Sequence, residues 1–402
     1  MQNSPVSNTG SAASLGKRGL VRQGRAPSAS SRKLVQWMQR EALPFWMKKG
    51  WDAKRGGFHE RFFFDGTPDD LVERRTRVQW RQIYVLAHAS LLGWADGLKL
   101  AFQGLELMLQ RAWAPDGRPG FVHALAPDGS VADAKRDSYD HAFALLALSW
   151  LARATDDAQV RALLDMVLGF IDQSLSDEHG YLIESQPPSL PRRQNPHMHM
   201  LESMLAMMET LAHPEAALRA ARYRKMVERT FLDRDSNLLV EHFDEFWRPM
   251  RDEEGGALVE PGHMAEWVWL IRKYERLCGQ KPSPLGTHFL GASLRAVEPV
   301  HGFLIDEIDT LQHVRAASRR LWPQTELIKA WLAQAEIGAD RADEAAEMMI
   351  DALMSEYLSG PFSGGWYDKF DSAGGIAVDT VPASSLYHVF VAAAEAERLL
   401  GS

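Results

Sequence analysis

The chain has 402 residues, 46% of them hydrophobic, a mean hydropathy of −0.27 and a formal net charge of −8. The apolar content is sufficient for a large core, and no stretch approaches the roughly 18 consecutive apolar residues of a membrane-spanning helix, so wholesale disorder and a transmembrane protein are excluded. The single cysteine, Cys278, excludes an internal disulfide, a Cys-ligated zinc site and an iron–sulfur cluster, and favours a reducing, cytoplasmic setting.

Residues 1–30 are rich in Ser, Gly, Asn, Ala and Arg without an apolar period, and we expect a disordered basic tail there. Residues 1–33 hold six basic residues and no acid, which leaves a charge of −14 for the remainder because the total is −8. A solvated tail is favoured over an arm that binds nucleic acid or a membrane. The acidic body argues against nucleic acid as the main partner, and no apolar segment of signal-peptide type is present.

From Ser31 onward, apolar residues recur every three or four positions, which predicts helices. Twelve segments show this period: Leu34–Trp46, Val78–Leu92, Leu98–Trp113, Ala142–Leu151, Val160–Ile171, Met198–Leu211, Ala216–Phe231, Met264–Leu277, Phe289–Val297, Leu327–Ile337, Ala342–Tyr357 and Leu386–Leu399. Short strand-like segments lie between helix pairs, beside Gly and Asp-Gly turns.

These short segments recur at a nearly constant distance. Neighbouring segments are about sixty residues apart, as marked by Gly57, Gly120, Gly180, Leu238, Gly302 and Gly365. The chain is therefore interpreted as six units, each a helix pair with a short hairpin. An open solenoid would be expected to show stronger repeat identity and capping units, so closure into a ring is favoured. The predicted fold is all-α: an (α/α)6 barrel over residues 31–402, forming one catalytic domain with short β-hairpins between the helix pairs.

Polar residues gather at the start of the helix that follows each hairpin. One residue from each start again shows the interval of about sixty residues: Arg77, Tyr139, His199, His263, Gln324 and His388. In a closed barrel these helices form the inner ring, so that all six starts meet at one mouth. Helix N-termini also offer unpaired N–H groups and a positive dipole end, which suit hydroxyls and developing oxyanions. This registration predicts a functional site.

Some of these residues have a structural explanation that remains open. Arg77, Arg81 and Tyr84 share a helical face, which fits a buried ion-pair cluster as well as substrate binding. Asn195 could act only as an N-cap ahead of Pro196.

The histidines carry the functional interpretation. His263 follows the sharp Pro-Gly entry of its helix, and Glu266 lies one turn later, where a carboxylate would fix the imidazole tautomer and raise its pKa. His263 and His388 together would form an acid/base pair that works near neutral pH. His197 and His199 are two residues apart and point to different helix faces, so joint metal ligation is disfavoured. Phosphate-binding Gly-rich loops, metal-binding motifs and the Gly-x-Ser-x-Gly motif of serine hydrolases do not occur.

Six motifs point to a known family when they are taken together. They are Tyr139-Asp140-His141-Ala142-Phe143, the segment from Arg192 to His199, Glu260-Pro261-Gly262-His263, the segment from Arg320 to Glu326, Gly364-Gly365-Trp366-Tyr367, and the segment from Pro382 to His388. Over residues 31–400 this set resembles the N-acylglucosamine 2-epimerase superfamily, and within it the D-mannose isomerases.

The resemblance implies an (α/α)6 barrel and metal-independent sugar isomerisation without a cofactor, by proton transfer between C1 and C2 of an opened hexose. It implies that His263 and His388 are catalytic and that Glu266 and His199 assist them. Residues implied to hold or shape around the sugar are Arg77, Tyr139, Asn195, Trp322 and Gln324. Some relatives also use an arginine in the loop before the Gly-His motif, where this chain has Arg248 and Arg251.

The expected reaction is the interconversion of D-mannose and D-fructose through a cis-enediolate, with D-lyxose and D-xylulose as a further pair. His388 is favoured for ring opening, and His263, tuned by Glu266, for transfer between C1 and C2, while Arg77 and the helix N-termini stabilise the oxyanion. The rivals are a sugar 2-epimerase, a catalytically dead sugar-binding barrel, and an inverting glycosidase with carboxylates among Asp140, Glu266 and Glu326. A free neutral sugar is the expected partner, and the chain is expected to be a monomer or homodimer.

Overall fold

The computed structural model describes residues 29–400, so the expected disorder of residues 1–28 lies outside the described residues. Two residues assigned to the tail, Ala29 and Ser30, belong to the first helix, α1 (Ala29–Trp37). Ser30 is buried there because its hydroxyl donates a hydrogen bond of 2.8 Å to Asp351 on the neighbouring helix α12 (Ala342–Glu356).

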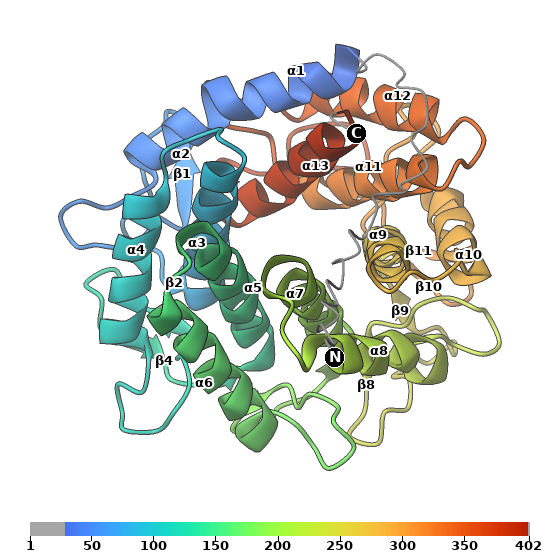
Figure 1. Cartoon of the computed structure of the whole chain (residues 1–402). Helices are drawn as coiled ribbons and strands as arrows, with labels where there is room; N and C mark the ends of the chain where they lie inside the picture. The colour runs from blue at the N-terminus through green and yellow to red at the C-terminus, as the bar shows by residue number, and fades with distance from the viewer. Residues whose placement is uncertain (1–28, 401–402) are drawn as a thin grey trace, which may run out of the picture.

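The twelve predicted helical segments are present, arranged as two concentric rings (Figure 1). The inner ring consists of α3 (Thr76–Leu91), α5 (Ser138–Thr155), α7 (Asn195–Leu211), α9 (Pro261–Leu277), α11 (Leu321–Glu336) and α13 (Ser384–Leu400). The outer ring consists of α1 continued by η1 (Met38–Ala42) and α2 (Leu43–Lys49), α4 (Leu98–Leu107) with η2 (Met108–Ala112), α6 (Ala158–Ser174), α8 (Ala216–Met226) with η3 (Val227–Phe231), α10 (Pro284–Ser293) with η4 (Leu294–Ala296), and α12.

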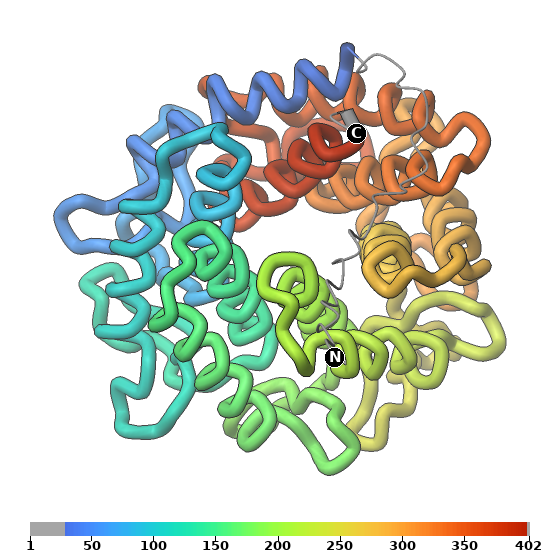
Figure 2. Tube along the Cα trace, in the orientation of Figure 1, coloured from blue at the N-terminus to red at the C-terminus, as the bar shows by residue number. Residues whose placement is uncertain are grey.

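The inner ring is closed, because α13 packs against α11 on one side and against α3 on the other. The tube in Figure 2 follows this closure, with the last helix beside the first units of the chain. The open solenoid is therefore excluded and the (α/α)6 barrel is confirmed.

Short antiparallel strand pairs connect each unit to the next. The strand before an inner helix pairs with the first strand of the following unit in five places: β2 (Arg74–Arg75) with β3 (Ala124–Leu125), β5 (Arg136–Asp137) with β6 (Ser185–Gln186), β7 (Arg192–Arg193) with β8 (His242–Phe243), β9 (Leu258–Val259) with β10 (Glu307–Asp309), and β12 (Arg319–Arg320) with β13 (Lys369–Phe370). The sixth pair joins β14 (Thr380–Pro382) to β1 (Arg61–Phe63) and closes the ring. β4 (Val131–Asp133) and β11 (Val314–Ala316) extend two of these pairs to three strands.

Burial distinguishes the two rings. The inner helices are enclosed on nearly all sides, and every residue of α9 from Pro261 to Glu275 is buried. This explains why inner segments such as that of α5 read as almost continuous apolar runs, whereas outer helices bury one face. Trp80, Trp267 and Trp366 are among the largest fully buried side chains, so most of the aromatic content serves the core.

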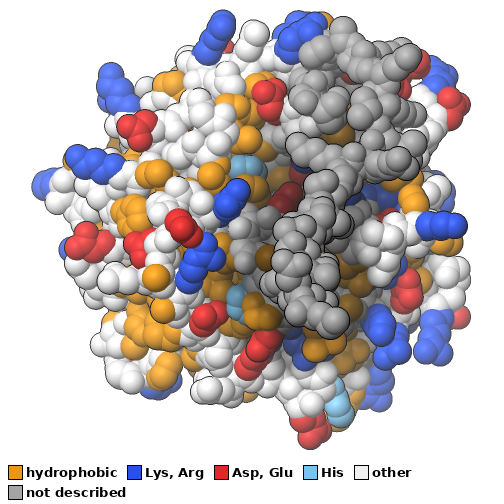
Figure 3. All heavy atoms as spheres, viewed as in Figure 1, with side chains coloured by type: hydrophobic (Ala, Val, Ile, Leu, Met, Phe, Trp, Pro, Cys, Tyr) orange, Lys and Arg blue, Asp and Glu red, His pale blue; other side chains and the backbone are white. Residues whose placement is uncertain are grey.

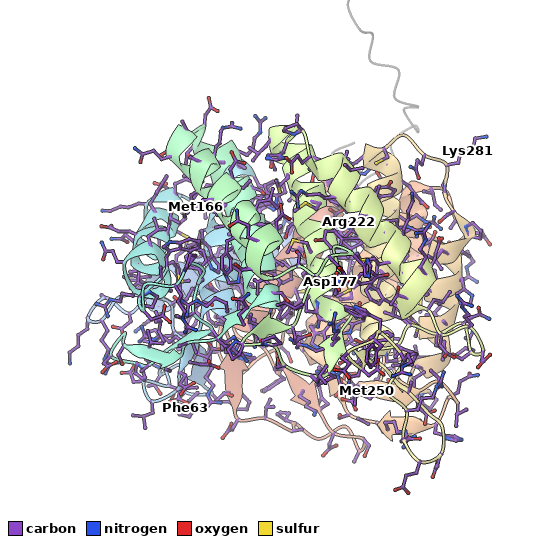
Figure 4. All side chains as sticks on the ribbon, turned by 90° about the horizontal axis from the view of Figure 1, so that it is seen from below. Phe63, Met166, Asp177, Arg222, Met250 and Lys281 are labelled. Carbon is purple, nitrogen blue, oxygen red and sulfur yellow. The ribbon has the colours of Figure 1, made fainter. Side chains whose placement is uncertain are left out.

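The inner helices begin before the apolar period does: α9 starts at Pro261 and α11 at Leu321, three and six residues ahead of the predicted Met264 and Leu327. Their first turns are polar, which hides the helix from a search for apolar periodicity. All six first turns lie at the end of the barrel that carries the strands. Figure 4 shows this end with Phe63 and Met250, opposite the α9–α10 turn marked by Lys281. Within residues 29–400, no helix combines the length and apolarity needed to cross a membrane.

Candidate active site

The first two turns of the inner helices form two layers with identical spacing. The outer layer, at the helix starts, contains Arg77, Tyr139, Asn195, Gly262, Trp322 and Ser384. Each residue of the inner layer follows four positions later on the same helix, and these residues are Arg81, Phe143, His199, Glu266, Glu326 and His388. Four residues are about one helical turn, so each inner-layer side chain lies below its outer-layer counterpart. The inner-layer side chains are buried, whereas Arg77, Tyr139, Asn195 and Trp322 are half-buried and border solvent.

Gln324 lies outside both layers, contrary to the sugar-binding role implied for it. Its amide oxygen accepts the backbone N–H of Leu304 at 2.8 Å, and its nitrogen donates to the carbonyls of Leu304 and Arg320 at 2.9 Å each. Gln79, His141 and His197 hold the hairpins of their own units in the same way. Gln324 is fully buried, and its amide is occupied by the backbone.

His263 is paired with a carboxylate, but not with the one expected. Its Nδ1 lies 3.0 Å from Oε2 of Glu241 and 4.0 Å from Oε2 of Glu260, whereas Glu266 forms no ion pair with it. Burial alone would lower the pKa of His263, but Glu241 and Glu260 outweigh it and raise that pKa to about 9. His263 is therefore an imidazolium at neutral pH.

Three neighbours fix the position of the His263 ring. Its Nε2 lies 3.2 Å from the amide of Asn195, whose Oδ1 is buried without a hydrogen-bond partner in the described part of the chain. Exchanging the oxygen and nitrogen of this amide lets the oxygen accept the proton of the imidazolium. Trp322 covers the imidazole at 4.8 Å between ring centroids. Gly262 permits this contact, because a Cβ there would lie 2.8 Å from the Trp322 ring. The N-cap alternative for Asn195 is wrong, because Gln194 is the N-cap of α7 and Asn195 is its first helical residue.

His388 has the opposite electrostatic setting. Its Nδ1 lies 2.8 Å from Oε1 of Glu326, and Oε2 of Glu326 forms a 2.5 Å ion pair with the fully buried Lys329. Burial first, and then the charges of Arg81 and Lys329, hold the pKa of His388 well below its ordinary value. His388 is therefore neutral. The Trp322 ring lies 5.7 Å from His388, so one tryptophan contacts both histidines.

His199 and Glu266 meet next to these residues. Nδ1 of His199 lies 2.9 Å from Oε2 of Glu202 and 3.9 Å from Oε1 of Glu266. Tyr387 donates its hydroxyl proton to the other oxygen of Glu202. Glu266 is fully buried, and neither of its oxygens has a hydrogen-bond partner among residues 29–400. An unsatisfied buried carboxylate beside two histidines is a ready acceptor for a substrate hydroxyl.

The sequence left open whether Arg77 and Arg81 of α3 form structural ion pairs or bind substrate, and the two arginines differ in this respect. Arg77 lies 3.4 Å from Asp140, whose other oxygen binds His123 at 2.6 Å, so Arg77 takes part in a structural ion pair at the rim. Arg81 is 5% exposed and donates to the Tyr139 hydroxyl at 2.8 Å and the Ser384 carbonyl at 3.2 Å. It packs over the rings of Phe143 and Tyr387 at 4.2 and 4.9 Å. No carboxylate of the described residues forms an ion pair with Arg81, which leaves its charge available.

Glu241, Glu202, Lys329 and Arg81 were not selected as site residues from the sequence. A signal for Glu241 was present, because a polar residue recurs after the hairpins at the interval of about sixty residues: Glu60, His123, Glu184, Glu241, Asp306 and Asp368. In three units the acid binds the arginine that precedes the inner helix: Glu60 binds Arg75, Glu184 binds Arg193, and Asp306 binds Arg320. In the fourth unit that arginine is replaced by Glu260, and the acid contacts His263 instead. The loop arginines Arg248 and Arg251 pair with Asp244 and Asp233 of their own region, away from the two layers.

Some of these side chains have the composition of a metal site. Ligand atoms lie within 4.8 Å of one another in the group His199, Glu202 and Glu266, and likewise in the group Glu241, Glu260 and His263. Each group could hold a divalent cation through one imidazole and two carboxylates. In the first group, the positive charge of Lys329 already offsets the negative charge of the carboxylates, because Lys329 lies near Glu202, Glu266 and Glu326.

The N-acylglucosamine 2-epimerase (GlcNAc 2-epimerase) family model matches residues 56–392. The chain belongs to this family. A mannose-6-phosphate isomerase of Rhizobium meliloti is 33% identical over 378 residues, covering 92% of this chain and 97% of that protein. A D-mannose isomerase of Thermobifida fusca is 28% identical over 342 residues, which cover 78% of this chain and 82% of that protein. Among solved structures, a D-mannose isomerase superposes with a TM-score of 0.82 at 20% identity, covering 93% of this chain and all (100%) of the other.

The family resemblance inferred from the six motifs is therefore confirmed. The chain is an enzyme of the sugar isomerase and epimerase class, which sets aside the catalytically dead barrel and the glycosidase.

Proposed function

We propose that this family member is an aldose–ketose isomerase that interconverts D-mannose and D-fructose, and in the same way D-lyxose and D-xylulose. The observation that carries the proposal is the pair of buried histidines under one tryptophan, with Nδ1 of His263 at 3.0 Å from Glu241 and Nδ1 of His388 at 2.8 Å from Glu326. Their surroundings shift the two pKa values in opposite directions, which favours a cationic His263 and a neutral His388. Such a pair supplies a general acid and a general base in the same site at neutral pH.

Ring opening uses both histidines. Neutral His388 accepts the proton of the anomeric hydroxyl through Nε2, in the tautomer whose Nδ1–H donates to Glu326 at 2.8 Å. Cationic His263 gives its proton to the ring oxygen, so that the C1–O5 bond breaks. The two histidines exchange charge in this step, which leaves His263 neutral and able to act as a base.

Transfer between C1 and C2 then follows. His263 removes the C2 proton, and the cationic His388 protonates O1, which gives a cis-enediol. His388 next accepts the proton of O2, while His263 delivers its proton to C1, and the ketose results. The expectation that His388 opens the ring alone is thus extended, because the charge of His263 makes it the acid of that step.

Arg81 replaces Arg77 as our choice for stabilising the negative charge that develops on O1 and O2. Its guanidinium lies among buried aromatic rings without an ion-pairing carboxylate, where a fixed charge acts more strongly than in water. Tyr139, held by Arg81, and Asn195 are proposed to position hydroxyls at the half-buried layer, and Trp322 to pack against the sugar. Glu266 and His199 assist as acceptor and donor.

A free neutral sugar is the proposed substrate, although one relative is named a mannose-6-phosphate isomerase. The arginines bordering the site at Arg75, Arg77, Arg193 and Arg320 are each engaged by a carboxylate. A phosphate group would have to displace one of these partners. We expect kcat/KM for mannose to exceed that for mannose 6-phosphate at least ten-fold.

Product analysis by NMR in heavy water tests the proposal. Mannose should yield fructose that carries deuterium at C1 to the extent that the proton on His263 exchanges with solvent before its transfer, and EDTA should leave the rate unchanged. His263→Ala and His388→Ala should each lower kcat by a factor of about 100 or more. Formation of glucose instead of fructose would show a 2-epimerase, loss of activity with EDTA would show a metal enzyme, and near-normal turnover of either variant would refute the mechanism.

A further inference from the structure

A cavity lies on the barrel axis at the end opposite the hairpins. Its volume is about 180 Å³, far above the roughly 10–15 Å³ that one water molecule requires. Residues of α3, α5, α7, α9 and α13 line it, most of them from the later turns of these helices. We call it the rear cavity and define it by Tyr84, Trp150, Glu202, Glu209, Trp269 and Lys273. The end at which the inner helices finish faces the viewer in Figure 3, where acidic and basic side chains are interspersed.

One wall of the rear cavity is aromatic. Trp150 is held flat by His88, which stacks on it with 3.6 Å between centroids and 21° between planes. Burial lowers the pKa of His88 to about 3, so the stacked pair of His88 and Trp150 is uncharged. Trp269 adds a buried indole N–H without a hydrogen-bond partner among the described residues. Trp269 contributes its ring to the lining of the cavity.

The other wall carries charged side chains that are mostly paired, with Glu397 as a further acidic lining residue. Lys273 lies 2.8 Å from Glu209, and Arg398 lies 2.8 Å from Glu395. Such pairs offer donors and acceptors in fixed positions while cancelling each other's charge. A flat aromatic face beside fixed polar groups suits a molecule with one C–H face and several hydroxyls.

We propose that the rear cavity is a second binding site, for a small neutral polyhydroxy compound of the sugar or sugar-alcohol class. The ligand packs its C–H face against Trp150 and exchanges hydrogen bonds with the Glu209–Lys273 pair. The inference does not depend on the proposed reaction, since it rests on the lining alone.

The rear cavity also borders residues that contact the inner layer of the candidate active site. Glu202 lines it and at the same time holds Nδ1 of His199 at 2.9 Å and accepts the hydroxyl proton of Tyr387. Tyr387 packs edge-on against His388 at 4.8 Å. An occupant that bonds to Glu202 therefore acts on two histidines of the active site from the opposite end of the barrel.

Calorimetric titration with D-sorbitol, which has no carbonyl group and cannot be isomerised, tests the inference. Ala394→Phe places a ring in the cavity, and Met348→Phe, at a position 70% exposed on α12, is the matched control. Lys273→Met with Glu209→Gln is a second cavity variant that preserves the net charge. We expect a binding component that persists in His263→Ala and in Met348→Phe, and that weakens at least ten-fold in both cavity variants.

Two related ligands define the chemical class. D-gluconate and D-glucamine have the carbon chain of sorbitol with an anionic or a cationic end, and each should bind at least five-fold more weakly. Tighter binding of either would overturn the neutral class. Identical sorbitol isotherms for the parent protein and for a folded cavity variant, or no sorbitol binding by the parent protein, would overturn the site.

Discussion

The two histidines that we propose as catalytic have the same side chain, but their pKa values are shifted in opposite directions because their neighbours differ. His263 lies against Glu241 and near Glu260, whereas His388 is buried near Arg81 and Lys329. The assignment of acid and base therefore depends on residues that do not themselves transfer protons. A substitution of one such neighbour should change the pH dependence of turnover more than its maximum.

Glu241→Gln removes the main charge that keeps His263 protonated. In the parent protein kcat/KM should fall as the pH rises through about 9, because His263 then loses its proton. In the variant this fall should occur lower by about one pH unit or more. The stability contribution of the pair follows the same sign: the folded pKa is raised, so the contribution is complete below the ordinary value of 6.5 and is lost as the pH rises through about 9.

A pH profile of kcat/KM for both proteins measures this shift. Glu184→Gln is the matched control, because Glu184 occupies the equivalent place in another unit and binds Arg193 rather than a histidine. An unchanged profile in Glu241→Gln, or an equal shift in the control, would contradict the assignment of His263 as the acid.

Gly262→Ala should separate Trp322 from His263. The new Cβ would lie 2.8 Å from the Trp322 ring and from Pro323, so the ring must move. We expect kcat/KM to fall at least ten-fold, with a stability loss of about 1–3 kcal/mol from overpacking. Steady-state kinetics and thermal melting check this. Gly291→Ala, in α10 with nothing within 4 Å of its Cβ, should keep full activity, and an active Gly262→Ala would show that Trp322 does not position the site.

At the scale of elements, the regular spacing of the helix starts predicted which side chains gather in the candidate site, but it did not predict the buried charges around them. His199, His263 and His388 were predicted because polar residues interrupt apolar helices at regular distances. Lys329 was not predicted to belong to the site, because it follows Glu326 by three residues on α11, and this spacing of opposite charges is typical of solvated helix faces. Its role depends on the burial of both side chains, which only the packing of neighbouring helices decides.

Lys329→Met tests this buried pair. Lys329 favours the ionised form of Glu326, so that Nδ1 of His388 donates and Nε2 stays free to accept a proton. Burial and Glu266 already raise the pKa of Glu326 well above its ordinary value, and Lys329 is the charge that opposes them. Without Lys329 we expect Glu326 to hold a proton and the tautomer of His388 to reverse. We expect kcat to fall about 100-fold and the free energy of unfolding to fall by about 3–5 kcal/mol.

The double variant Glu326→Gln/Lys329→Met separates the two effects. It removes both charges together, so stability should recover by more than about 1 kcal/mol while kcat stays low, because no carboxylate orients His388. Denaturant titration and kinetics measure the two quantities. Full activity in Lys329→Met would refute its positioning role.

At the scale of the whole molecule, ring closure is what brings the six helix starts together. His388 follows β14, and β14 pairs with β1, which belongs to the opposite end of the chain. The number of units was predictable from the repeat distance of about sixty residues, and closure was favoured because an open solenoid would show stronger repeat identity and capping units. The identity of the closing strands was not, because β1 and β14 are three residues long and carry no period of their own.

Two adjacent phenylalanines of β1 allow the closure to be tested. Phe62 is fully buried and packs at 5.2 Å against Phe45 and 5.4 Å against Trp46, whereas the neighbouring Phe63 is 40% exposed. Phe62→Ala should lower the free energy of unfolding by about 3–5 kcal/mol, and Phe63→Ala by less than about 1 kcal/mol. Denaturant titration followed by circular dichroism and by tryptophan fluorescence provides both values.

Activity should follow closure as well. Phe62 pairs with Val381 of β14, two residues before Ala383, and the Ala383 carbonyl accepts a hydrogen bond from Gln82 while its N–H donates to the Glu60 carbonyl. Loosening this joint displaces the start of α13 and with it His388. We expect kcat of Phe62→Ala to fall while the half-transitions of the two probes still coincide, since a closed ring unfolds as a unit. Separate transitions for the two probes would instead show that the units unfold independently, as in an open repeat array.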